Sequence, residues 1–225
     1  MKATIHSFIY LSDNTLKDTQ PSDMTVVGIG ASTGALDALL QLLKHIPEHT
    51  GLTYVVVVHL LASDESHLHE ILKHGSNIPV QQVEGDTPLE PDHVYVIPPN
   101  SNLNSIDRQL RLSTLKQAGR SPIDHFFRSL ANTHDGHSVG IVLTGTGADG
   151  TLGLREIRRQ GGLTIVQDPG EAEQESMPLS AISGGQVDAV LPLDKIPGFF
   201  LNYTQCEPDV DPMIKENTIK SETKS

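Results

Sequence analysis

The segment Gly30-Ala31-Ser32-Thr33-Gly34 has the residue types and the spacing of a reactive serine. It matches the G-x-S-x-G pattern, in which a sharp strand-to-helix turn exposes a serine hydroxyl for attack on a carbonyl carbon. Gly28, Gly30 and Gly34 also form a loose dinucleotide-binding pattern, in which the main-chain N–H groups of the turn would hold a pyrophosphate. An ordinary glycine turn is the third interpretation, so this segment leaves three alternatives open.

A histidine and an aspartate elsewhere in the chain could complete the chemistry of a serine nucleophile. His59 ends the apolar run 55–58, and Asp149 lies in a glycine-rich loop after the run 139–143. A serine hydroxyl needs an imidazole to take its proton and a carboxylate to orient that imidazole. Each residue also has an ordinary explanation, Ser32 and Asp149 as turn or helix caps and His59 as a core histidine. Three suitable residues at three strand ends favour a single site.

A parallel sheet would bring these three residues together. Apolar runs predict strands at 26–29, 54–58, 139–143, 163–166 and 187–191, with helices between them. Such runs lack polar alternation, which is typical of strands that are buried on both faces. Further short strands at 94–97, 101–106 and 109–112 suggest a small antiparallel addition. We therefore expect a doubly wound, mainly parallel α/β sheet with helices on both faces, whose functional groups collect at the carboxyl ends of the strands.

The composition limits the class of protein. With 225 residues and 37% hydrophobic content, the chain can form one good-sized core. No apolar run approaches the roughly 20 residues of a membrane span, and no signal peptide is present, so we expect a cytoplasmic protein without direct membrane insertion. The single cysteine, Cys206, excludes an internal disulfide. A net charge of −12 argues against nucleic acid as the partner.

The polarity of the two ends divides the chain into three parts. Residues 1–23 are mixed and polar, and we interpret them as a leader. Residues 24–204 carry the predicted strands and helices and form one domain. Residues 205–225 are rich in acidic residues, lysine and proline, which is typical of a disordered tail or linker.

The chain order Ser32, His59, Asp149 differs from the serine, acid, histidine order of the α/β-hydrolases, which indicates another lineage of serine hydrolase. Five motifs together resemble the catalytic domain of the CheB-type chemotaxis protein-glutamate methylesterases: Gly28-Ile29-Gly30-Ala31-Ser32-Thr33-Gly34, Val57-Val58-His59-Leu60, Tyr95-Val96-Ile97-Pro98-Pro99, Ser121-Pro122-Ile123-Asp124 and Leu143-Thr144-Gly145-Thr146-Gly147-Ala148-Asp149-Gly150. The resemblance extends from about Val26 to Leu193. It implies hydrolysis of glutamate γ-methyl esters on chemoreceptors to glutamate and methanol, with deamidation of receptor glutamines as a related activity.

The same resemblance implies roles for individual residues. Ser32 would be the nucleophile, His59 the general base and Asp149 the acid that orients the base. The main-chain N–H groups at Thr33 and Thr146 would form the oxyanion hole, although many relatives have methionine at the second position. No metal and no cofactor is expected.

Two further features of the resemblance concern substrate and partners. Met177 and Pro178 resemble a substrate loop beside the family's active site, while Glu175-Ser176 before them departs from the usual pattern. The typical member has a receiver domain in front, which 23 polar residues cannot supply. Segments at 145–147, 151–155 and 167–169 resemble versions fused to a receptor methyltransferase. The implied partners are the cytoplasmic domain of a methylated chemoreceptor and a fused or separate receptor methyltransferase.

Other interpretations predict different residues. A nucleotide-binding Rossmann domain would place an acidic ribose ligand at the end of the second strand, where this chain has His59. A docking module would keep the fold without turnover. His67, His69 and His74 with Glu70 suggest zinc, but the first two histidines are two positions apart and would point to different faces of a helix. A solvated helix face is the favoured interpretation there.

Overall fold

The structure, a computed structural model, describes residues 24–59, 67–114, 121–134, 136–184 and 187–205. The predicted leader at 1–23 lies outside the described residues. So does the predicted tail, except Gln205, which is the last residue of the final helix.

The core of the molecule is a seven-stranded sheet in which every neighbouring pair of strands is parallel. The strand order is β10-β9-β8-β1-β2-β5-β3. The strands are β1 (Val26–Ala31), β2 (Thr53–Val58), β3 (Val80–Gln82), β5 (His93–Val96), β8 (Ser138–Val142), β9 (Leu163–Gln167) and β10 (Ala189–Leu191). Because β1, β2 and β8 are buried along their whole length, the absence of polar alternation in their sequences is explained.

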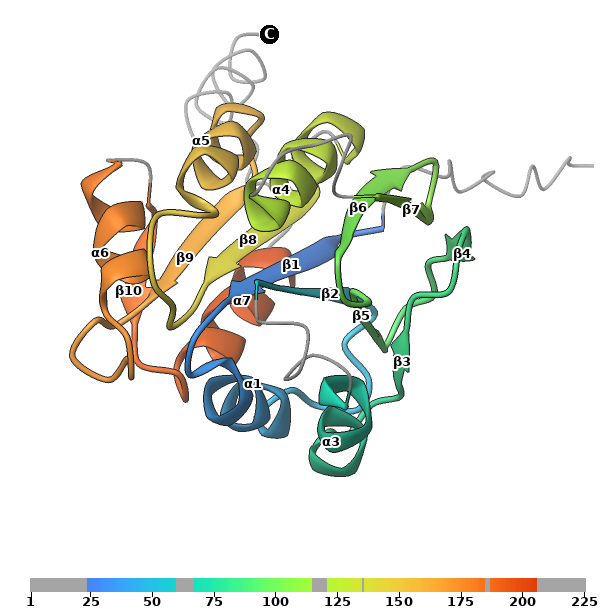
Figure 1. The fold of residues 1–225 in the computed structure, drawn as a ribbon, viewed down its shortest axis with the longest axis horizontal. Coiled ribbons are helices and arrows are strands. Elements are labelled where there is room, and N and C mark those ends of the chain that lie inside the picture. Colours follow the sequence, from blue (N-terminus) through green and yellow to red (C-terminus); the bar gives the residue numbers. More distant parts are fainter. Residues whose placement is uncertain (1–23, 60–66, 115–120, 135, 185–186, 206–225) are drawn as a thin grey trace, which may run out of the picture.

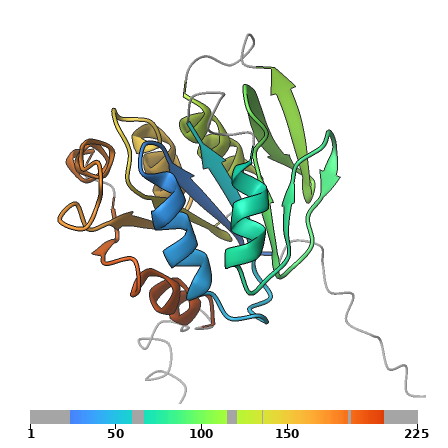
Figure 2. The same cartoon turned by 60° about the horizontal axis from the view of Figure 1, so that its bottom comes forward.

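Helices cover both faces of this sheet, as predicted. They are α1 (Ala35–Lys44), α3 (Leu68–Gly75), α4 (Pro122–Thr133), α5 (Thr151–Arg159), α6 (Ser176–Ser183) and α7 (Ile196–Gln205). Figure 1 shows α4 and α5 on one face and α1, α3 and α7 on the other. In Figure 2, α1 and α3 lie side by side in front of the sheet, where Leu40 of α1 packs onto Gly75 of α3. None of the helices in the described residues combines the length and the hydrophobicity that a membrane crossing needs.

A second, three-stranded antiparallel sheet packs beside α4. Its order is β4-β7-β6, formed by β4 (Thr87–Pro88), β7 (Gln109–Thr114) and β6 (Ser101–Ile106). The prediction of a small antiparallel addition is confirmed, but its membership was partly wrong. The predicted strand at 94–97 is β5, which pairs in parallel with β2 and β3 in the main sheet. Val94, Tyr95 and Val96 are buried, which is the pattern of a strand covered on both faces.

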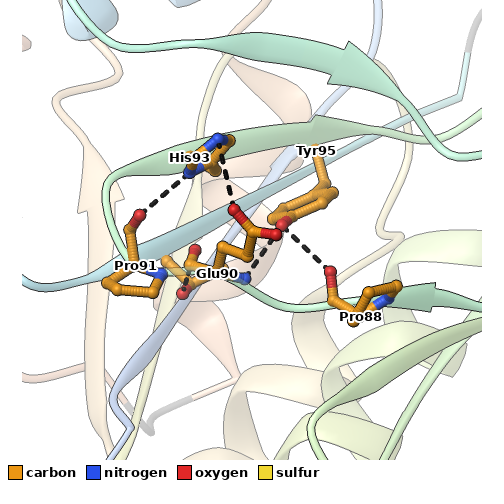
Figure 3. Close-up of polar contacts among 6 residues, drawn as sticks. Pro88, Glu90, Pro91, His93 and Tyr95 are labelled. Carbon is orange, nitrogen blue, oxygen red and sulfur yellow. Dashed lines mark hydrogen bonds and ion pairs between the residues drawn. The ribbon is translucent and has the colours of Figure 1, made fainter.

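Polar contacts connect the chain between β4 and β5 (Figure 3). The Tyr95 hydroxyl donates to the main-chain oxygen of Pro88 at 3.0 Å and accepts from the main-chain N–H of Glu90 at 2.9 Å. The His93 ring bonds the main-chain oxygen of Pro91 at 2.9 Å through Nδ1 and lies 3.8 Å from the Glu90 carboxylate. These contacts connect β4, and with it the small sheet, to β5 of the main sheet.

Two glycines of the opening motif serve packing. Gly28 and Gly30 lie within β1, which extends to Ala31, so the prediction that the strand ends at 29 was two residues short. A Cβ on Gly28 would lie 2.9 Å from a ring carbon of Phe127, and one on Gly30 would lie 2.4 Å from Cγ2 of Ile123. The glycines thus allow α4 to lie directly on the central strand.

Candidate active site

The three residues predicted to carry the chemistry lie at the carboxyl edge of the main sheet. Ser32 directly follows β1 and His59 directly follows β2, while Asp149 lies in the loop between β8 and α5. Hydrogen bonds beyond the strands join these ends: the His59 N–H donates to Ala31 O and the Ser32 N–H donates to Thr144 O, both at 3.0 Å. Because β1 has β2 on one side and β8 on the other, this edge is the switch point where ligands bind in doubly wound sheets.

Ser32 is 5% exposed and begins the turn that leads into α1. The N-cap of α1 is Gly34, whose left-handed φ of 79° turns the chain, so Ser32 does not cap this helix. The Ser32 hydroxyl instead donates to the main-chain oxygen of His59 at 2.7 Å. The serine is therefore held at the end of the central strand by a contact to the neighbouring strand.

Asp149 is fixed by main-chain N–H groups. Its carboxylate accepts from Ile123 at 3.1 Å and Asp124 at 2.9 Å, in the first turn of α4, and from Gly150 at 2.9 Å. Burial raises the pKa of Asp149, and the charge of Asp124 adds to this increase, while the N–H groups and nearby His59 act in the opposite direction. Asp149 thus caps a helix, as one of its ordinary explanations predicted, but the helix is α4 and not α5, which follows it in the chain.

His59 is exposed at the end of β2. Among the described residues, the hydrogen bonds of the Ser32 hydroxyl and of the Asp149 carboxylate go to main-chain groups and not to the His59 ring. The influence of His59 on the pKa of Asp149 places the two side chains within electrostatic reach. The structure thus gathers the three residues at one edge without joining their side chains in a relay, and free active sites often tighten such bonds only with substrate.

The glycine loop between β8 and α5 is held on both sides of Thr146. The Gly145 carbonyl accepts from the Met177 N–H at 2.9 Å, and the Gly147 N–H donates to Ser176 Oγ at 3.2 Å. Within the described part of the chain, the Thr146 N–H itself donates to no protein group. The loop therefore holds the Thr146 N–H in a fixed position without a described protein acceptor.

Thr33 lies beside Thr146, the other residue of the predicted oxyanion hole. The two hydroxyls are 3.5 Å apart, and both residues are exposed. The Thr33 carbonyl accepts from the Thr144 hydroxyl at 3.1 Å, whereas the Thr33 N–H has no acceptor among the residues that the structure describes. Two free N–H groups next to a serine at the start of a helix favour a developing negative charge.

Met177 and Pro178 are both buried in the first turn of α6. A Cβ on Gly145 would lie 2.8 Å from Cε of Met177 and 2.8 Å from Cβ of Ser32. The serine and the methionine therefore both pack closely against Gly145, which leaves no room there for a side chain. Met177 thus helps to fix the loop next to Ser32.

Thr144 and Gln167 are site residues that sequence patterns did not single out. Both are 1% exposed, and the Gln167 side-chain oxygen accepts from the Thr144 N–H at 2.8 Å. The Thr144 hydroxyl also accepts from the Gln174 N–H at 2.9 Å. Their signal in the sequence is a polar residue at the carboxyl end of a buried strand, β8 for Thr144 and β9 for Gln167.

A pocket of about 280 Å³ begins at Gly34, two residues beyond Ser32. It lies between the start of α1 and α3, and its lining includes Leu36, Leu68, Ile71 and Glu173. Ile71 is 43% exposed, which leaves an apolar surface at this pocket.

Two of the three histidines at α3, His67 and His74, make ordinary surface contacts, while His69 is half-buried and its Nδ1 has no hydrogen-bond partner among the described residues. His67 Nδ1 lies 3.7 Å from the Glu70 carboxylate, and His74 Nδ1 bonds the Glu70 carbonyl at 2.7 Å. In the described ranges, no three His, Cys, Asp or Glu side chains gather as metal ligands would.

Comparisons with known proteins agree in one family. Residues 27–200 match the model of the CheB methylesterase family. A Leptospira interrogans protein provisionally named protein-glutamate methylesterase/protein-glutamine glutaminase is 34% identical over 79% of this chain and 93% of its own length. A Trichodesmium erythraeum protein-glutamate methylesterase/protein-glutamine glutaminase is 32% identical over 77% of this chain, which spans about half of that relative (51%). The crystal structure of the Thermotoga maritima CheB methylesterase catalytic domain superposes with a TM-score of 0.72 and 26% identity, over 80% of this chain and 98% of that one.

Proposed function

Because the chain belongs to the CheB methylesterase family, we propose that it is a serine hydrolase that removes γ-methyl esters from chemoreceptor glutamates, releasing methanol. The observation that carries the proposal is the position of Ser32 directly after the central strand, next to Thr33 and against the loop that carries Thr146. Thr33 and Thr146 are exposed, and their N–H groups donate to no described protein group. This arrangement suits attack on a carbonyl carbon and stabilisation of the resulting oxyanion.

The first half of the proposed reaction forms an acyl-enzyme. Ser32 Oγ leaves the His59 carbonyl and turns to the His59 ring, which takes the hydroxyl proton as Oγ attacks the ester carbonyl carbon. The carbonyl electrons move to the oxygen, which the N–H groups of Thr33 and Thr146 stabilise. Collapse of this intermediate breaks the bond to the methoxy oxygen, which takes the proton from His59 and leaves as methanol.

The second half frees the enzyme. A water molecule gives its proton to His59 and attacks the acyl carbon, and the proton then returns to Ser32 Oγ as the bond to Oγ breaks. The product is a glutamate side chain. Asp149 stabilises the charged imidazole in both halves, and its fixed position at the start of α4 suits this role.

Deamidation of receptor glutamine follows the same path with an amide as the substrate. Ammonia replaces methanol as the leaving group, and it needs the proton of His59 before it can depart. The two activities that the names of the relatives combine thus require one set of groups. We propose both activities for this chain.

The proposed partner is the cytoplasmic domain of a methylated chemoreceptor, and we therefore also propose a cytoplasmic location for this protein. The pocket beside Gly34 combines apolar side chains with Glu173, and we propose that it receives receptor residues next to the modified glutamate. A receptor methyltransferase, fused or separate, is the second proposed partner.

A nucleotide-binding function is less well supported. Gly28 and Gly30 lie inside β1 between two paired strands, and α4 covers them. Their N–H groups are therefore not arranged around a phosphate site.

The experiment that tests the proposal compares wild type with Ser32→Ala. We expect methanol release from a methylated receptor to fall by at least about 10⁴-fold, since removal of a nucleophile removes the covalent route. A fluorophosphonate should label wild type at Ser32. Ser76→Ala, which removes a serine hydroxyl bonded to Ile78 O at the end of α3, is the matched control and should keep full activity. Methanol release by Ser32→Ala, or labelling at another serine, would contradict the assignment.

A further inference from the structure

Two carboxylates join the N-terminal ends of α4 and α5. Asp149, two residues before α5, accepts from the main-chain N–H groups of Ile123 and Asp124 in the first turn of α4. Asp124 in turn accepts from the N–H of Gly153, in the first turn of α5, at 2.7 Å. A carboxylate at or just before the start of each helix thus caps the other helix, and Figure 1 shows the two helices side by side on one face of the sheet.

Glycines make this exchange possible. A Cβ on Gly153 would lie 2.4 Å from Cβ of Phe127 and 3.2 Å from Cα of Asp124. Gly150, with a left-handed φ of 91°, would place a Cβ 2.9 Å from Cγ2 of Ile123. A side chain at either position would push α5 away from α4, so the sequence keeps the two helix starts close enough for both bonds.

The choice of aspartate for the second cap costs stability. Asp124 is 6% exposed, and a buried carboxylate loses its hydration. Its charge also opposes the ionisation of Asp149. A helix start can be capped by serine or threonine without either cost. An arrangement that is costly in this way is typical of a functional site.

We propose that Asp124 is a positioning residue, which fixes the Asp149 carboxylate at the carboxyl edge of the sheet by holding the start of α5 against α4. This inference rests on the proposed esterase function. Asp124 acts through Gly153 and the loop that carries Asp149, and it touches neither the substrate nor the reacting atoms. Loss of its bond would allow the loop to move and Asp149 to leave its place within reach of His59.

The test uses two substitutions at this position. We expect Asp124→Ala to lower kcat for methanol release by about 10- to 100-fold with KM unchanged, because displacement of a catalytic group by about 1 Å has an effect of this size. Asp124→Asn keeps an oxygen that can accept from Gly153, so it should restore most of kcat. Asp124 and His59 are the charged groups that act on Asp149. Asp124→Asn, which removes this negative charge and keeps the bond to Gly153, should therefore move the acid limb of the pH profile to lower pH.

The matched control is Asp92→Ala. Asp92 accepts from the main-chain N–H groups of Thr50 at 2.7 Å and Gly51 at 2.8 Å, at the opposite edge of the sheet. This variant should lower the melting temperature and leave kcat unchanged below the transition. An Asp124→Ala protein that likewise loses only stability would overturn the positioning role.

Hydrogen exchange separates this inference from the proposed function. In an Asp124→Ala protein, the main-chain N–H groups of residues 123 and 124 should exchange faster, because Asp149 no longer accepts their hydrogen bonds. This measurement needs no substrate. A wild type that releases no methanol would overturn the esterase proposal, while faster exchange in the variant would still support the positioning of Asp149. Unchanged exchange of both N–H groups would overturn the positioning.

Discussion

The Ser32 hydroxyl lies 2.7 Å from the main-chain oxygen of His59 and donates a hydrogen bond to it. The proposed nucleophile is thus bonded to the residue that carries the proposed base, but through the main chain. In this arrangement the main chain holds the hydroxyl, while the imidazole is exposed. The proposed reaction requires the hydroxyl to exchange the carbonyl for the ring.

Substitution of the exposed His59 ring should separate activity from stability. In His59→Gln, the main-chain oxygen that accepts from Ser32 remains, so we expect no change in the melting temperature. Methanol release should fall by about 10²- to 10⁴-fold, because the proton acceptor is lost. Turnover and thermal unfolding of the same preparation check both parts. Wild-type turnover in this variant would exclude His59 as the base.

The Asp149→Asn variant should lose activity although the change is nearly isosteric. An amide cannot stabilise a charged imidazole as a carboxylate does, and we expect kcat to fall by up to about 10⁴-fold. Asp168→Asn is the control, since Asp168 accepts from the Gly170 N–H in an exposed turn. Equal effects of the two substitutions on kcat would contradict a special role for Asp149.

A methyl group on Gly145 should displace Ser32 or the loop that carries Thr146. It would lie 2.8 Å from carbon atoms of both Ser32 and Met177, so the loop or the serine must move. We expect Gly145→Ala to lower kcat by about 10²-fold and the free energy of unfolding by about 1–3 kcal/mol. Gly198→Ala in α7, where no atom lies within 4 Å of the added carbon, should be neutral or stabilising. Kinetics and urea unfolding of both variants make the comparison.

Packing of α4 on β1 can be tested with a double-mutant cycle. Gly30→Ala would place a methyl group 2.4 Å from Cγ2 of Ile123, and we expect a destabilisation of about 1–3 kcal/mol. Combination with Ile123→Ala makes room for this methyl group, so the two effects should be less than additive. Additive free energies of unfolding would show that the helix does not rest on this glycine.

The fold should lose stability in mild acid through His134. Its Nε2 lies 2.8 Å from Ser105 Oγ, and both residues are buried. Burial lowers the pKa of His134, so the unfolded chain takes up the proton first as the pH falls below about 6.5. Stability is full above this pH and decreases below it. The midpoints of urea unfolding at about pH 7.5 and pH 5.5 measure this loss of stability. The loss should be smaller in His134→Gln. It should not vanish, because burial also lowers the pKa of His125, which contributes to the loss in the same way.

The sequence was sufficient to predict the fold class and the family, and both are confirmed. Unalternated apolar runs identify strands of a parallel sheet, and Ser32, His59 and Asp149 follow three of them. The roles of these three residues remain predictions. Contacts between segments that lie far apart in the chain could not be predicted from the sequence. The assignment of 94–97 to the wrong sheet is one case, because the sequence of a short strand does not determine which strands it pairs with.

The details of the site show the same limit. Gly28 and Gly30 fit a phosphate-binding pattern, and only the position of α4 shows that they make room for a helix. Thr144 and Asp124 look like ordinary polar residues in the sequence. Their importance comes from burial and from the N–H and C=O groups they meet, which depend on how the loops after β8 and β9 fold together.

The bonds at the carboxyl edge join segments that are synthesised far apart. The Thr144 hydroxyl reaches the carbonyl of Thr33, 111 positions earlier in the chain. A chain folded only as far as β5 would hold Ser32 and His59, but neither Asp149 nor the loop that carries Thr146. Contacts of such high sequence separation carry a high loop-closure cost, and they cannot form before β8 and the loop after it have been synthesised. A nascent chain would therefore stay inert toward esters until β8 has inserted beside β1, so the appearance of esterase activity would time the completion of the domain.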